Sequence, residues 1–118
     1  MRRLGVAGRT LFSSFDEVAA VEIARAEPPL YAALLSGGAG TALLQRVAAL
    51  DLSAIHPSWS GSTAEAVATG HALGLQVNLW TVNTRRYLEQ SLAKAPDAII
   101  TDEPVVLAEL LRTPPSLR

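Results

Sequence analysis

Apolar residues along the chain fall into short runs separated by polar, glycine and proline residues. Four of these runs are typical of strands, and they lie at residues 10–15, 53–57, 76–83 and 97–101. Helical spacing of the apolar residues predicts helices at 17–26, 41–50, 62–73, 84–95 and 104–112. The run at 30–35 fits either element, because short apolar runs look alike in both. Strands that alternate with helices in this way predict an α/β fold with a parallel sheet.

Polar residues and glycine mark several of the expected helix ends. Asp16 stands where the N-cap of the first helix is expected. Ser62 and Glu65 have the spacing of a capping box, in which each side chain satisfies a free backbone N–H of the other residue. Gly74 is expected to end that helix. After the last helix, residues 113–118 are expected to form a frayed tail.

The strand expected at 76–83 has two unlike faces. Val77 and Leu79 make one face apolar, whereas Asn78 and Trp80 belong to the other, mostly polar face. A barrel strand has this pattern, because one face packs on helices and the other faces a lumen that becomes a site at its carboxyl end. An edge strand with one solvated face has the same pattern, so both interpretations remain open here.

Composition narrows the class of protein. The 118 residues suffice for one domain, and a net charge of −1 gives no basic surface for nucleic acid. The absence of cysteine excludes disulfides, thiolate metal sites and a thiol nucleophile. Although 49% of the residues are hydrophobic, no apolar run approaches the roughly 20 residues of a membrane span. Glycines interrupt the stretch after Met1, so we recognise no targeting segment and expect a soluble, cytoplasmic protein.

Three motifs in order resemble a known family. They are LFSSFD at 11–16, GHALGLQVNLWTVNT at 70–84 and PDAIITDEP at 96–104. The chain from about Gly5 to Leu111 resembles the C-terminal half of the glycerophosphodiester phosphodiesterases, in which Ser-Phe, Trp-Thr-Val-Asn and Thr-Asp-x-Pro end the fifth, seventh and eighth barrel strands. The resemblance implies that residues 1–118 are one partial domain, the C-terminal half of a TIM (β/α)8 barrel with four to five parallel strands.

The resemblance also implies a reaction and a substrate site. The family hydrolyses glycerophosphodiesters to glycerol 3-phosphate and an alcohol, assisted by a divalent metal such as Mg²⁺ or Ca²⁺. By resemblance Trp80 lies against the glycerol end of the substrate, and Phe15 and Asn83 are further substrate-binding candidates. Each has a plainer alternative: Trp80 as a core residue with a satisfied indole N–H, Phe15 as core, and Asn83 as the cap of the helix from Thr84.

The residues that carry the family's chemistry are not recognisable in this chain. They lie in the first half of the barrel and include a His-Arg-Gly and a Glu-x-Asp, whereas neither of the two histidines here precedes Arg-Gly. We expect His56 to be a surface or loop-anchoring residue and His71 to be structural, and Asp102 is explained by the dipole of the last helix. We therefore predict no catalytic residue and no metal ligand in this chain, which alone should be inactive.

Three hypotheses follow for the role of such a chain. It is a fragment or truncated form of an enzyme whose catalytic residues lie elsewhere. Alternatively, it is a half-barrel that pairs with a second copy or with a separate N-terminal half, because half of a barrel leaves unpaired strand edges and uncovered apolar surface. The third hypothesis is a non-catalytic α/β module that binds phosphate at the glycine loop 37–40.

Overall fold

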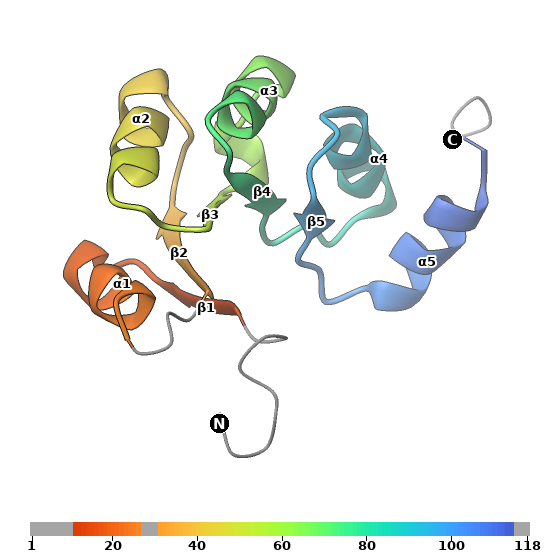
Figure 1. The fold of residues 1–118 in the computed structure, drawn as a ribbon. Coiled ribbons are helices and arrows are strands. Elements are labelled where there is room, and N and C mark those ends of the chain that lie inside the picture. The colour runs from red at the N-terminus through yellow and green to blue at the C-terminus, as the bar shows by residue number, and fades with distance from the viewer. Residues whose placement is uncertain (1–10, 27–30, 115–118) are drawn as a thin grey trace.

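A computed structural model describes residues 11–26 and 31–114, and its described strands form one parallel sheet (Figure 1). The strands are β1 (Leu11–Ser14), β2 (Tyr31–Ser36), β3 (Ala54–Pro57), β4 (Gln76–Leu79) and β5 (Ala98–Ile99), and their order in the sheet is their order in the chain. The helices are α1 (Glu17–Ala24), α2 (Thr41–Ala49), α3 (Ala64–Ala72), α4 (Arg85–Ala93) and α5 (Pro104–Arg112), with a short 3-10 helix, η3 (Trp59–Gly61). The predicted α/β class is confirmed, and the ambiguous run at 30–35 belongs to strand β2.

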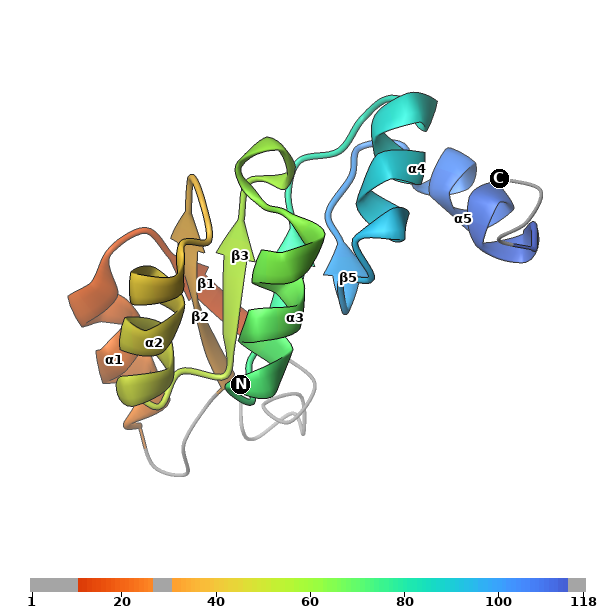
Figure 2. The same ribbon diagram turned by 90° about the horizontal axis from the view of Figure 1, so that it is seen from above.

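The helices lie on one side of the sheet, as Figures 1 and 2 show. The main core fills the space between the sheet and these helices, with Leu34, Leu44, Val47, Ile55, Val67, Val77 and Leu79 among its buried members. The predicted apolar face of β4 is therefore the face that packs on helices. Sequential parallel strands with every helix on the same side are the arrangement of a (β/α) barrel.

Two strands, β2 and β3, lie between the strand that carries the Ser-Phe motif and the strand that carries the Trp motif. The family numbering of these motif strands as fifth and seventh leaves room for one strand between them. The described part of this chain thus has one more strand in this interval than the numbering implies. The five strands still agree with the expected four to five.

A smaller core lies where α4 and α5 cover β5. Its fully buried residues are Val82, Leu88 and Leu110. Trp59 joins this cluster to the main core, and its ring stacks on Tyr87 with 4.2 Å between centroids. Lys94 Nζ donates to the Trp59 carbonyl oxygen at 2.6 Å, and burial lowers the pKa of this lysine. The segment after β3 is thereby fixed to α4.

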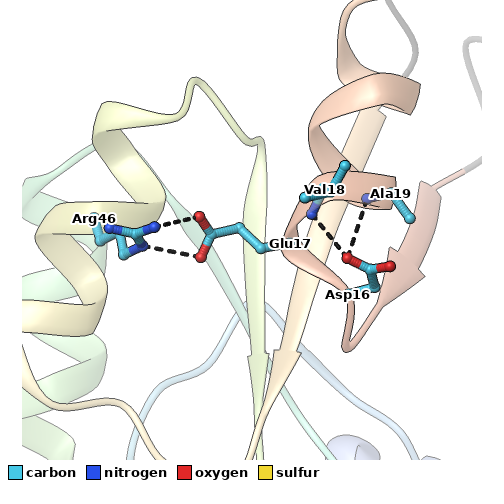
Figure 3. Close-up of polar contacts among 5 residues, drawn as sticks. All are labelled: Asp16, Glu17, Val18, Ala19 and Arg46. Atoms are coloured by element: carbon cyan, nitrogen blue, oxygen red, sulfur yellow. Dashed lines mark hydrogen bonds and ion pairs between the residues drawn. The ribbon is translucent and has the colours of Figure 1, made fainter.

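The helix ends follow the sequence signals in part. Asp16 Oδ1 accepts a hydrogen bond from Val18 N at 3.0 Å, which confirms the predicted N-cap (Figure 3). The predicted capping box is wrong, because the N-cap of α3 is Thr63 and Ser62 is a buried residue whose hydroxyl donates to the Ser58 carbonyl oxygen at 2.8 Å. Gly74 has φ +80 and follows the end of α3, as expected.

Strand β4 is shorter than the predicted segment 76–83. Its ladder ends at Leu79, and beyond it only an isolated bridge joins Trp80 to Ser58. The reason lies in the neighbouring strand, since β3 ends at Pro57 and the chain then enters η3. Of the tail expected to fray, Thr113 hydrogen bonds to the last turn of α5, and residues 115–118 lie outside the described residues.

An ion pair on the surface connects the first two helices. Arg46 Nη2 of α2 lies 2.6 Å from Glu17 Oε1 of α1, and Arg46 Nε donates to the other carboxylate oxygen at 2.9 Å (Figure 3). This bidentate hydrogen bonding lowers the pKa of Glu17. Arg46 is exposed and Glu17 is partly exposed, so the pair orients α1 and α2 and adds little to stability.

Candidate functional site

We call the side of the sheet opposite the helices the inner face. Residues that alternate with the core residues of each strand belong to it. Near the carboxyl ends of the strands the inner face carries Phe15, Leu35, His56, Asn78 and Trp80. In barrels of this architecture, active sites are built at the carboxyl ends of the strands. This end of the inner face is therefore the candidate site.

The two aromatic candidates from the sequence lie together. The rings of Phe15 and Trp80 meet edge to face, with 5.9 Å between centroids and an interplanar angle of 84°. Phe15 is 66% exposed, so the alternative that it is a core residue is wrong. The pair forms an apolar wall at the carboxyl ends of β1 and β4.

The indole N–H of Trp80 is already used within the chain. Trp80 Nε1 donates to the carbonyl oxygen of His56 at 2.7 Å. The N–H is therefore satisfied, as expected if Trp80 is a core residue. The side chain itself, however, is only half-buried. What Trp80 offers to a ligand is the surface of its ring.

His56 occupies an unexpected position. It lies in β3 and is 6% exposed, so the expectation of a surface or loop-anchoring histidine is wrong. Its Nε2 lies 2.9 Å from Nδ2 of Asn78, which is 5% exposed. Burial lowers the pKa of His56, so the ring is neutral near pH 7. Alternation with the core residue Ile55 is the sequence signal that could have placed His56 on the inner face.

Two buried polar atoms of this pair remain unsatisfied. His56 Nδ1 and Asn78 Oδ1 have no hydrogen-bond partner among the residues that the structure describes. Buried polar atoms are nearly always paired in folded proteins, so an orphaned pair is a marker for a bound group or an ordered water.

Asn83 lies at the rim of this end and joins two strand ends. Its Nδ2 donates to Asp102 Oδ2 at 3.0 Å, and the backbone N–H of Asp102 donates to Asn83 Oδ1 at 2.9 Å. The alternative role as a helix cap is wrong, because Thr84 caps α4 and accepts from Tyr87 N. Both Asn83 and Asp102 are exposed, so their outward surfaces remain accessible to a ligand.

His71 lies at the opposite end of the sheet. Its Nε2 is 2.7 Å from Asp97 Oδ2, and the same oxygen accepts from Val77 N at 2.7 Å, where β4 begins. This arrangement agrees with the structural role expected for His71. The two histidines therefore lie apart: His56 is on the inner face, and His71 is among exposed contacts at the amino ends of the strands.

The carboxylates near the site do not converge on a common point. No group of three or more His, Cys, Asp or Glu residues within the described ranges could hold a metal ion. Asp16 is used as a helix cap and Asp102 is bonded to Asn83. The described residues therefore do not fit a divalent cation.

A cavity of about 320 Å³ lies between α2 and α3, beside the glycine loop 37–40. Its lining includes Gly40, Thr41 and Thr63 at the helix starts, but also the carboxylate-bearing Glu65. A negative side chain opposes phosphate binding, so the cavity does not favour the phosphate-module hypothesis.

Among the described helices, none has the length and apolar character needed to cross a bilayer.

Comparison with known proteins gives consistent matches. A model of the glycerophosphoryl diester phosphodiesterase family matches residues 2–106. A Silicibacter pomeroyi DSS-3 structure, provisionally assigned as a glycerophosphoryl diester phosphodiesterase, is 30% identical with a TM-score of 0.82, covering 92% of this chain and 41% of that chain. A comparison with curated proteins found no match.

Two further structures share the fold. A phosphodiesterase from Oleispira antarctica, solved in complex with the product sn-glycerol-3-phosphate, is 23% identical with a TM-score of 0.77, covering 87% of this chain and 42% of that one. A glycerophosphodiester phosphodiesterase from Parabacteroides distasonis ATCC 8503 is 24% identical with a TM-score of 0.77, covering 93% and 46% respectively. The chain thus spans less than half the length of the structures it matches.

Proposed function

The chain belongs to the glycerophosphoryl diester phosphodiesterase family, and from this we propose that it supplies the C-terminal half of a barrel that hydrolyses glycerophosphodiesters to glycerol 3-phosphate and an alcohol. The observation that carries the proposal is the family match over residues 2–106, which includes the aromatic pair at the carboxyl ends of the strands. The chain alone is inactive in this proposal, because its described residues contain no metal-binding cluster.

In the proposed site, Phe15 and Trp80 contact the carbon skeleton of the glycerol moiety. Aromatic rings bind such apolar surfaces through contact area, and the Trp80 N–H is already held by His56. Asn83 lies at the rim, where its link to Asp102 fixes the direction of its amide. The bound sn-glycerol-3-phosphate in the Oleispira antarctica structure supports a glycerol-type ligand for the fold.

The proposed partner is an N-terminal half-barrel that carries the His-Arg-Gly and Glu-x-Asp motifs. Strands β1 and β5 end the described sheet on its two sides, and the inner-face residues Tyr31 and Ile100 are 54% and 41% exposed. Closing a barrel pairs both edges and covers such residues. A second copy would also cover this surface, but it would bring the same residues and no catalytic motif. The Mg²⁺ or Ca²⁺ of the reaction would be held by the N-terminal half.

The test is complementation between two purified polypeptides. The 118-residue chain is mixed with the N-terminal half of a family member, and hydrolysis of glycerophosphocholine is measured with Mg²⁺ or Ca²⁺. We expect hydrolysis only in the mixture, with a heterodimer by light scattering. Hydrolysis by the chain alone would contradict the proposed division of roles, and a failure to associate would contradict the proposed partner. The cytoplasmic location stays a prediction from the sequence.

A further inference from the structure

The unsatisfied atoms of His56 and Asn78 have opposite requirements. An amide nitrogen only donates, so the contact from Asn78 Nδ2 makes His56 Nε2 an acceptor. The single proton of the neutral ring then resides on Nδ1, which becomes an unsatisfied donor. Asn78 Oδ1 is an unsatisfied acceptor. If the amide is turned by 180°, the roles exchange, but one donor and one acceptor again remain.

This combination selects the chemistry of a ligand. A phosphate oxygen is an acceptor, and an ammonium group is a donor, so each would satisfy one of the two atoms and leave the other unpaired. A hydroxyl group both donates and accepts, and it carries no charge into a buried site. Register places Leu35 on one side of His56 and Asn78 on the other, and neither side chain is charged.

We propose that His56 and Asn78 form a hydrogen-bonding subsite for the hydroxyl groups of a polyol, beneath the aromatic wall of Phe15 and Trp80. Trp80 joins the two parts, because its ring contacts Phe15 while its N–H is bonded to the backbone of His56. The rings of Phe15 and Trp80 contact the carbon–hydrogen surface of the polyol, and His56 and Asn78 form hydrogen bonds with its hydroxyl groups. The identification of this polyol as glycerol rests on the proposed function.

Access to the pair requires a side-chain movement on the inner face. The two unsatisfied atoms are shielded from solvent in the structure. Phe15 and Trp80 lie at the same end of the inner face as the pair, and Phe15 is 66% exposed.

The two histidines of the chain allow a direct test by NMR of the imidazole nitrogens. The 118-residue chain is titrated with glycerol and, separately, with inorganic phosphate. We expect glycerol to shift the His56 resonances to saturation, while His71 and the phosphate titration show no comparable change. Equal shifts of His56 and His71 would indicate a general solvent effect and overturn the subsite. A silent His56 would show that an internal water or packing alone satisfies the pair, which also overturns it.

Variants distinguish ligand contact from indirect effects. Asn78→Leu removes the polar partner at nearly constant volume and should weaken glycerol binding by about tenfold, the loss expected for one hydrogen bond. Phe15→Ala, at an exposed position, should retain the fold and bind glycerol more weakly, because it removes one ring of the aromatic wall. If Asn78→Leu does not fold, the titration of the unmodified chain decides, because a His56 that does not respond to glycerol would contradict the subsite.

The subsite and the proposed function fail separately. Restored hydrolysis in the mixture of half-barrels, together with a silent His56, would leave the function in place and overturn the subsite. A glycerol response at His56 without any hydrolysis by the mixture would support the subsite and contradict the function.

Discussion

The rings of Phe15 and Trp80 are in contact, although two strands, β2 and β3, lie between β1 and β4, the strands that these residues follow. Neighbouring strands lie about 4.8 Å apart, so a flat sheet would place β1 and β4 roughly 14 Å from each other. The ring centroids are nevertheless 5.9 Å apart. Both side chains therefore reach inward over β2 and β3, which is the geometry of a curved sheet with a lumen on its inner face.

Trp80→Phe tests the anchoring of this pair. The substitution keeps an aromatic ring but removes the N–H that donates to the His56 carbonyl. We expect the free energy of unfolding to fall by about 1 kcal/mol, measured by urea denaturation. Because the substitution also changes the ring contact with Phe15, the decrease that remains in a Phe15→Ala background measures the hydrogen bond without that contact. An unchanged free energy of unfolding would mean that the hydrogen bond from the indole N–H to the His56 carbonyl oxygen adds no stability.

His56 predicts a pH dependence of stability. Burial lowers its pKa in the folded chain, so the unfolded chain binds the proton first as the pH falls. The stabilisation is complete above the unfolded pKa of about 6.5 and is lost progressively below it, down to the folded pKa. Urea denaturation midpoints measured from about pH 7.5 down to 5.5 should follow this decline, because most carboxylates do not titrate in that range.

A matched pair of variants assigns this dependence. His56→Gln should abolish the decline, whereas His71→Gln should retain it, because His71 is exposed and lies at the other end of the sheet. The same decline in His56→Gln as in the unmodified chain would assign the effect to another group.

Gly61 tests the contact between the loops that follow β2 and β3. A Cβ at this position would collide with the carbonyl oxygen of Gly37, so the two backbones can approach only without a side chain. Gly61→Ala should lower the free energy of unfolding by about 1–3 kcal/mol. Gly37→Ala is the control, since its Cβ would have nothing within 4 Å. Thermal unfolding compares them, and equal stabilities would show that the loops are free to separate.

Local spacing predicted the elements better than it predicted their polar contacts. The alternation of strands and helices, the Asp16 cap and the apolar face of β4 all depend on residues close in sequence. The capping position of α3 depends instead on the Ser62 hydroxyl, which bonds to Ser58 and leaves the cap to Thr63. Two adjacent hydroxyl residues make either assignment reasonable until the fold is known.

The site residues show the same limit over longer distances. Asn83 directly precedes a helix, where a cap is expected, yet its amide forms hydrogen bonds with Asp102, which follows strand β5. His56 and Asn78 meet because β3 and β4 are neighbours in register, which no local pattern contains. Resemblance located Phe15 and Trp80, but their contact depends on the curvature of the whole sheet.

Ile100→Lys tests whether the inner face is a surface of assembly. Ile100 follows β5 on the inner face and is 41% exposed, so a lysine there is tolerated by the isolated chain. In a closed barrel the same position is covered, and burying an unpaired ammonium is strongly unfavourable. We therefore expect Ile100→Lys to leave the thermal unfolding of the chain nearly unchanged and to reduce its association with the N-terminal half by tenfold or more, on the order of 1.4 kcal/mol. Leu73→Lys is the matched control, because Leu73 is 38% exposed but lies at the end of α3, away from the inner face. Equal affinities of the two variants, measured by light scattering or calorimetry, would show that the N-terminal half does not close over the inner face.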